Sequence, residues 1–241
     1  MKLSICHLYP DLLNLYGDRG NIIILCQRLQ WRGIRVELTE VSIGDEFEAS
    51  KYDLLFMGGG PDQEQSAVSR DLAKKGPYLV EAVENGLVVL SICGGYQLLG
   101  KSYVSRTGDN LPGVGIFDAV TTAGTSRLRG NIAIRVHELP EDYPVVGFEN
   151  HSGRTVLGTA SPFGQVIFGA GNNGQDKTEG ARYRNAFGTY LHGPILGKNP
   201  HLADYLLTLA LRRRYGEIVL KPLDDSLEKV VNQQFFKRFG G

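Results

Sequence analysis

Val88-Val-Leu-Ser-Ile-Cys-Gly-Gly-Tyr-Gln-Leu-Leu-Gly100 is the most informative stretch of this sequence. Its first part, Val88 to Ile92, is apolar and rich in β-branched residues, as a buried strand is. Cys93 follows at once, and two glycines lead into residues that favour a helix. A strand that delivers a nucleophile into a sharp turn between small residues is a nucleophile elbow, here with sulfur replacing the serine oxygen. We therefore expect Cys93 at a helix N-terminus, where the thiolate is favoured.

Composition narrows the class of protein. The 241 residues carry 26 basic and 26 acidic side chains, so net charge gives no argument for nucleic acid or a lipid surface. The three cysteines, Cys6, Cys26 and Cys93, are odd in number and scattered, which predicts free thiols and a reducing compartment rather than a disulfide framework. No signal peptide is evident, and no apolar run approaches the length of a membrane span. We expect a cytoplasmic protein.

The first hundred residues alternate between strand and helix patterns. Strands are expected at 3–9, 35–41, 53–57 and 88–92, with helices at 22–33, 63–74 and 77–84. This order predicts an α/β fold with a doubly wound, mostly parallel sheet and helices on both faces. In such sheets the site lies at the carboxyl ends of the strands.

Beyond Gly100 the pattern changes to short β-like pieces. They are expected at 113–122, 131–136, 145–150, 164–169 and 185–192, with a flexible polar loop at 170–184 and helices at 200–215 and 226–239. The phenylalanines of the last helix fit either the core or a partner surface. No linker composition divides the chain, so we expect a single domain, 1–241, with β insertions in its second half.

Gly58-Gly59-Gly60-Pro61-Asp62 ends the third expected strand. Glycines at a strand's carboxyl end let backbone N–H groups approach a ligand closely. A phosphate-binding loop is excluded, because no Gly-Lys-Ser/Thr follows. The remaining interpretations are a loose turn, or an oxyanion hole shared with the N–H of Gly94.

A cysteine nucleophile needs a base, and the sequence offers five histidines. His192 ends the apparent strand Phe187-Gly-Thr-Tyr-Leu-His192 and precedes a Gly-Pro turn, so it too should stand at a strand tip. His151, in Phe148-Glu-Asn-His-Ser-Gly153, is the serious competitor. A Cys–His pair predicts acyl transfer through a thioester.

These features resemble the class I glutamine amidotransferases, whose cysteine attacks the side-chain amide of glutamine and releases ammonia. More narrowly, the chain resembles the glutaminase subunits of lipid II isoglutaminyl synthases, relatives of the cobyric acid synthase glutaminases. The likeness spans nearly the whole chain. It is carried by Tyr9-Pro-Asp-Leu-Leu-Asn-Leu-Tyr-Gly-Asp18, Met57-Gly-Gly-Gly-Pro-Asp-Gln63, Ser91-Ile-Cys-Gly-Gly-Tyr-Gln97, Phe148-Glu-Asn-His-Ser-Gly153 and Tyr190-Leu-His-Gly-Pro194.

The resemblance implies roles for individual residues. Cys93 would be the nucleophile and His192 the base. The oxyanion donors would be the backbone N–H groups of Gly59, Gly60 and Gly94. Gln97 would help to hold the glutamine, and Arg127 would bind its α-carboxylate, with Arg129 as the alternative. No metal site is implied.

One position departs from the common class I pattern. A glutamate usually stands two residues after the histidine and orients its ring, but this chain has Pro194 there. The cobyric acid branch shares that departure. The third group of the site therefore stays open between Asp18, Glu149 and a carboxylate from another chain.

Ammonia is a wasted product unless an acceptor uses it, and the sequence contains no recognisable ATP motif. The resemblance implies a second polypeptide, a Mur-ligase-like ATP-dependent subunit that forms a heterodimer with this chain. That subunit would hold ATP and Mg²⁺ and amidate the D-glutamate α-carboxylate of lipid II to D-isoglutamine, a step of peptidoglycan biosynthesis. This chain itself would need no cofactor, and it would reach lipid II only through its partner.

Two other interpretations compete with this one. The chain could be the glutaminase subunit of a corrinoid-type or other amidating synthetase, which the neighbouring gene would reveal. It could also be a catalytically silent regulatory or binding domain, which a glutaminase assay would exclude. The coexistence of Cys93, His192 and the triple glycine disfavours the silent domain.

Overall fold

The computed structural model describes residues 1–140 and 143–240. Its main sheet has six strands in the order β11-β12-β4-β3-β1-β2. The parallel strands are β1 (Lys2–Leu8), β2 (Arg35–Val41), β3 (Leu54–Met57), β4 (Val88–Ile92) and β12 (Ala186–Thr189), and β11 (Ala181–Tyr183) is an antiparallel edge. The predicted parallel sheet is confirmed. All residues of β3 and β4 are buried, which explains why these strands are apolar except for Ser91.

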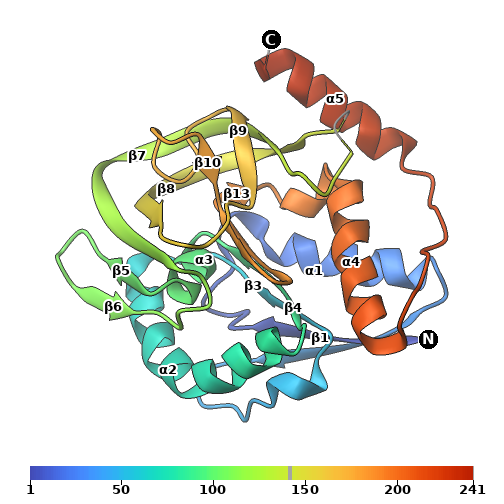
Figure 1. Ribbon diagram of the computed structural model, residues 1–241, viewed down its shortest axis with the longest axis horizontal. Coiled ribbons are helices and arrows are strands. Elements are labelled where there is room, and N and C mark those ends of the chain that lie inside the picture. The colour runs from blue at the N-terminus through green and yellow to red at the C-terminus, as the bar shows by residue number, and fades with distance from the viewer. Residues whose placement is uncertain (141–142, 241) are drawn as a thin grey trace.

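Helices cover both faces of this sheet (Figure 1). The helices α1 (Arg19–Gln30) and α4 (Pro200–Tyr215) pack together on one face, and α2 (Asp62–Glu84) lies on the other with the short α3 (Gly94–Leu99). Short 3-10 turns lie at η1 (Leu15–Gly17), η2 (Ala49–Lys51) and η3 (Ile195–Gly197). No helix among residues 1–140 and 143–240 is long and apolar enough to cross a membrane.

A second sheet is built around two long antiparallel strands, β7 (Ala119–Arg135) and β8 (Val145–Leu157). The other members are β5 (Ser102–Val104), β6 (Asn110–Pro112), β9 (Gly164–Phe168), β10 (Thr178–Glu179) and β13 (Leu191–His192). The strand expected at 113–122 and the one at 131–136 prove to be mostly one strand, whose register shifts between Ala123 and Leu128. Because β13 pairs with β8, the chain that leaves the main sheet at β12 enters the second sheet at His192.

Two expectations about the helices and loops were wrong. Residues 62–84 form one helix rather than two, although Pro77 lies inside it. The helix buries apolar side chains on both sides of the proline, Leu72 before it and Leu79 and Val83 after it. This burial outweighs the loss of the backbone hydrogen bond that proline cannot donate. Residues 170–184, expected to be a loop throughout, contain β10 and β11 in their second half.

The last helix, α5 (Ser226–Gly240), lies against β7, β8 and β9 and projects at the edge of the molecule (Figure 1). Its buried Asn232 donates hydrogen bonds to the carbonyl oxygens of Pro144 and Lys198. Phe236 contacts Phe168, whereas Phe239 stays largely exposed. The helix is therefore only partly a core element.

Candidate active site

Cys93 stands between the end of β4 and the start of α3, in the strained turn of a nucleophile elbow. Its backbone has φ 50° and ψ −105°, a conformation that a residue with a side chain rarely adopts. Gly95 has to be small, because a Cβ there would lie 2.7 Å from the carbonyl oxygen of Gly58. The Cys93 side chain is 8% exposed and lines a cavity. This geometry presents a single thiol to a ligand.

His192 and Asp18 lie close to Cys93, and Nε2 of His192 is buried with no hydrogen-bond partner among the described residues. The Nδ1 of His192 lies 3.1 Å from Oδ1 of Asp18, and both side chains are buried. A Cβ on Gly59 would lie 3.1 Å from the Cβ of Cys93, 3.3 Å from Cε1 of His192 and 3.5 Å from Oδ2 of Asp18. The side chains of Cys93, His192 and Asp18 therefore surround the position that a Cβ atom on Gly59 would occupy. This is the order nucleophile, imidazole and carboxylate of a catalytic triad.

The surroundings of His192 favour its charged form. Burial disfavours the imidazolium, but the hydrogen bond that His192 donates to Asp18 and the neighbouring sulfur of Cys93 outweigh this effect and raise the pKa of His192 to about 10. A hydrogen bond to Nδ1 leaves Nε2 as the nitrogen available to the thiol and substrate. Tyr16 packs edge-on against the imidazole, with ring centroids 4.8 Å apart.

Of the three candidate oxyanion donors, Gly59, Gly60 and Gly94, one already has a protein acceptor. The N–H of Gly59 donates to Oδ2 of Asp18 at 2.9 Å, so it is engaged in holding the carboxylate. In the part of the chain that the structure describes, no protein acceptor binds the N–H of Gly60 or Gly94. These two groups are neighbours, because a Cβ on Gly94 would lie 3.1 Å from the nitrogen of Gly60. Gly60 and Gly94 thus form a donor pair beside Cys93.

A cavity of about 450 Å³ opens in front of Cys93. Gln97 and Arg127 both line it, as expected of substrate-binding residues, and Arg129 is not among its lining residues. The Nε2 of Gln97 donates to the hydroxyl of Tyr190 at 3.2 Å, which leaves its Oε1 buried without a partner among the described residues.

Two further lining residues, Asn150 and Tyr16, lie in motifs that carry the resemblance but were given no individual role from the sequence. Asn150 receives hydrogen bonds from Nε and Nη2 of Arg127, at its side-chain and backbone oxygens. Its own Nδ2 donates to the hydroxyl of Tyr16 at 2.7 Å. Tyr16 has a positive φ of 55°, which is uncommon for a residue with a side chain. The bridge Tyr16–Asn150–Arg127 therefore links the ring that covers His192 to the candidate substrate arginine.

A model of a known domain family matches most of the chain. Residues 4–200 match the CobB/CobQ-like glutamine amidotransferase domain. The chain belongs to this family. A similar curated protein is the lipid II isoglutaminyl synthase (glutamine-hydrolyzing) subunit GatD of Staphylococcus aureus, 44% identical over 239 residues, which are 98% of this chain and 96% of that protein. The protein of the same name in Streptococcus pneumoniae is 42% identical over 97% of this chain and 90% of its own.

More distant members of the CobB/CobQ-like family are larger. A probable cobyric acid synthase of Methanococcus maripaludis is 31% identical over 195 residues, which cover 72% of this chain but 38% of that protein. Among solved structures, a crystal structure of a glutamine amidotransferase aligns with a TM-score of 0.55 at 18% identity, over 85% of this chain and 98% of that one. At this identity the likeness concerns the fold, and it agrees with the α/β architecture.

The alternative candidates in this CobB/CobQ-like chain were His151 for the base and Glu149 for the carboxylate that orients it, and both have other contacts. Glu149 accepts hydrogen bonds from the N–H groups of Ala170 and Gly171, at 2.7 and 2.9 Å, so it supports a turn. His151 is stacked on Tyr190 with centroids 3.6 Å apart, and burial lowers its pKa. His151 lines the cavity with its Nε2 3.7 Å from a carboxylate oxygen of Glu149, whereas Nδ1 of His192 lies at the shorter distance of 3.1 Å from Asp18.

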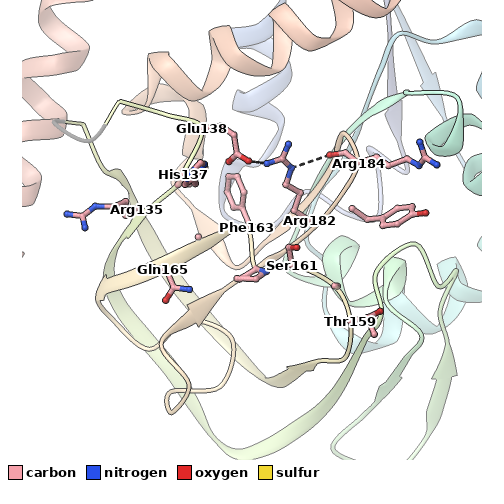
Figure 2. A pocket seen from close by; sticks show the side chains of 14 residues that line it. Arg135, His137, Glu138, Thr159, Ser161, Phe163, Gln165, Arg182 and Arg184 are labelled. Carbon is pink, nitrogen blue, oxygen red and sulfur yellow. Dashed lines mark hydrogen bonds and ion pairs between the residues drawn. The ribbon is translucent and has the colours of Figure 1, made fainter.

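The amidotransferase chain has a larger cavity, of about 630 Å³, away from Cys93 (Figure 2). Figure 2 shows one of its arginines, Arg182, between two partners: it pairs with Glu138 and donates to the carbonyl oxygen of Arg184. Arg184 in turn pairs with Glu84. No cysteine is among the residues that line this cavity. Across the described residues, no group of three or more His, Cys, Asp or Glu is placed to hold a metal ion.

Proposed function

We propose that this chain is the glutaminase subunit of a two-chain lipid II isoglutaminyl synthase. It hydrolyses L-glutamine to glutamate and ammonia through a thioester on Cys93. The observation that carries the proposal is the convergence of Cys93, His192 and Asp18 on Gly59, in a chain 44% identical to a protein named as a subunit of that enzyme.

In the first half-reaction the Cys93 thiolate attacks the carboxamide carbon of glutamine. The carbonyl oxygen takes the negative charge and is stabilised by the N–H groups of Gly60 and Gly94. His192, protonated at Nε2, gives that proton to the amide nitrogen. The C–N bond then breaks, ammonia leaves, and a γ-glutamyl thioester remains on the sulfur.

In the second half-reaction a water molecule attacks the thioester. Neutral His192 takes a proton from the water at Nε2, and Asp18 stabilises the imidazolium that forms. The C–S bond breaks, which regenerates the Cys93 thiolate and releases glutamate. Asp18 acts by holding the ring through Nδ1, so that Nε2 faces the sulfur in both steps.

Arg127 and Gln97 are proposed to hold the amino-acid end of glutamine. The guanidinium of Arg127 donates its Nε hydrogen and one Nη2 hydrogen to Asn150. The Nη1 group and the second Nη2 hydrogen remain available to bind a carboxylate. The free Oε1 of Gln97 is an acceptor suited to the α-ammonium group. The free oxygen of Gln97 and the free hydrogens of Arg127 match a zwitterionic ligand.

The ammonia is proposed to pass to a Mur-ligase-like partner in a heterodimer. The partner would bind ATP and Mg²⁺, activate the α-carboxylate of D-glutamate in lipid II, and form D-isoglutamine. This chain would contribute no cofactor. It would work in the cytoplasm, where the partner meets the stem peptide of lipid II.

The test is to purify the chain with and without a Mur-ligase-like neighbour from its native host. Glutamate release and amidation of lipid II with ATP would then be measured for each preparation. We expect a stable complex that amidates lipid II, and neither subunit able to do so alone with glutamine. A lone chain that consumes ATP and amidates an acceptor would refute the two-chain proposal.

A further inference from the structure

A buried amide lies against the two free N–H groups of the oxyanion hole. Gln65, near the start of α2, is 3% exposed, and its Nε2 donates to the carbonyl oxygen of Gly60 at 2.9 Å. A Cβ on Gly94 would lie 3.0 Å from both Cδ and Nε2 of Gln65. Gln65 also lines the cavity that contains Cys93. Its carboxamide is therefore packed beside both donors.

The bond to Gly60 fixes the orientation of this amide. Only nitrogen can donate to a carbonyl oxygen, so Nε2 of Gln65 faces Gly60 and Oε1 is the other end. That Oε1 is buried and has no hydrogen-bond partner within residues 1–140 and 143–240. Buried acceptors are nearly always paired, so an unpaired one that lines a ligand cavity indicates a donor on the ligand.

We propose that Oε1 of Gln65 accepts an N–H of the carboxamide of bound glutamine, and that this bond makes the site prefer glutamine over glutamate. The inference rests on the proposed function and names the residue that selects its substrate. When the substrate oxygen lies between the N–H groups of Gly60 and Gly94, the amide nitrogen is attached to the same carbon. The side chain packed against this donor pair is Gln65.

Glutamate has the same shape but offers no N–H at this position. Its second carboxylate oxygen would face Oε1 of Gln65, so two acceptors would meet without a proton in a buried space. A site built to hydrogen-bond a substrate N–H discriminates strongly against the analogue that lacks it. The same contact disfavours the product of the reaction, so glutamate leaves after the thioester is hydrolysed.

The experiment measures the affinity of glutamine and glutamate by calorimetry, in the full chain with Cys93→Ala so that glutamine is not consumed. Gln65→Met keeps the length of the side chain and removes both polar ends. We expect the ratio of the glutamate Kd to the glutamine Kd to fall by about tenfold or more. Gln65→Glu retains an oxygen acceptor and adds a charge, so glutamate should bind no better than to the parent. Gln63→Met, on the exposed side of the same helix, is the matched control and should leave the ratio unchanged.

Several outcomes would overturn the proposal. A purely structural role through Gly60 would weaken both ligands equally in Gln65→Met and leave the ratio intact. A parent chain that binds the two ligands equally also refutes it. If Gln65→Met fails to fold, tighter glutamate binding by Gln65→Glu refutes it. The proposed function is tested separately. It is refuted if the chain with Cys93 intact releases no glutamate in the presence of its partner, whatever the Gln65 variants show.

Discussion

Replacing Asp18 by asparagine tests the assignment of the third group. The carboxylate makes two buried bonds, 3.1 Å to Nδ1 of His192 and 2.9 Å to the N–H of Gly59. A hydrogen bond to a charged group contributes about 1.5–3 kcal/mol, which corresponds to a loss of roughly tenfold to 150-fold in rate. An asparagine can also donate to Nδ1 and stabilise the wrong tautomer, and this change costs about 10⁴ in a serine protease triad. We expect Asp18→Asn to lower kcat by about 10² to 10⁴.

The same variant has a signature in pH. The pKa of His192 is raised to about 10 in the folded chain, against an ordinary value of about 6.5. Protonation of His192 therefore stabilises the fold fully below pH 6.5, and this stabilisation is lost as pH rises toward 10. Without Asp18 the pKa of His192 falls, so the loss occurs at lower pH. Between pH 7 and 10, the Tm of Asp18→Asn should decline less than that of the parent.

The assay is glutamate release from glutamine, with thermal melting of the same samples across pH. Asp11→Asn is the matched control, because Asp11 is an exposed carboxylate in the same loop. Activity of Asp18→Asn within threefold of the parent, with an unchanged pH dependence of Tm, would show that another carboxylate orients His192. If Asp18→Asn is inactive by itself and becomes fully active when the partner is added, the partner supplies the carboxylate that orients His192.

The remaining predictions concern the nucleophile, the base and the substrate arginine. Cys93→Ala and Cys93→Ser should both reduce glutamine hydrolysis by several orders of magnitude with the fold intact by circular dichroism, and activity within tenfold of the parent would remove the thioester mechanism. His192→Ala should lose about 10² to 10⁴ in kcat while His151→Ala loses much less, and the reverse order would reassign the base. Arg127→Ala should raise KM roughly tenfold to a hundredfold, and a larger rise for Arg129→Ala would transfer the role to that residue.

The local parts of the fold could be predicted from the sequence, because each left a pattern within a few residues. The strand–cysteine–glycine–helix order around Cys93 identified the elbow, and the apolar runs of β3 and β4 identified a buried parallel sheet. The continuity of β7 could not be predicted, because its glycines and polar residues at 122–130 have the composition of a turn. In the structure that segment stays in one strand, since β8 pairs with it on both sides of the register shift.

The site shows the same division between local and distant information. Cys93 and His192 each stand at a strand tip, which the sequence reveals. Asp18 could only be offered as one of three choices, because it reaches His192 from 174 residues away through the folding of the sheet. Gly59 looked like an oxyanion donor by position, and only the contact with Asp18 shows its N–H to be engaged. The bridge through Asn150 could not be predicted, because it connects Tyr16 in the η1 turn with Arg127 in β7, and these elements are distant in sequence.

The crowding around Gly59 has a genetic consequence. Any amino-acid replacement of a glycine adds a carbon to its backbone, and at Gly59 that carbon would lie 3.1 Å from the Cβ of Cys93 and 3.3 Å from Cε1 of His192. The backbone there has no positive φ, so the sheet would still form. Cellular quality control removes chains that unfold, and it would overlook this one. We therefore expect a missense allele at codon 59 to give a folded chain in which Cys93 and His192 are displaced from each other.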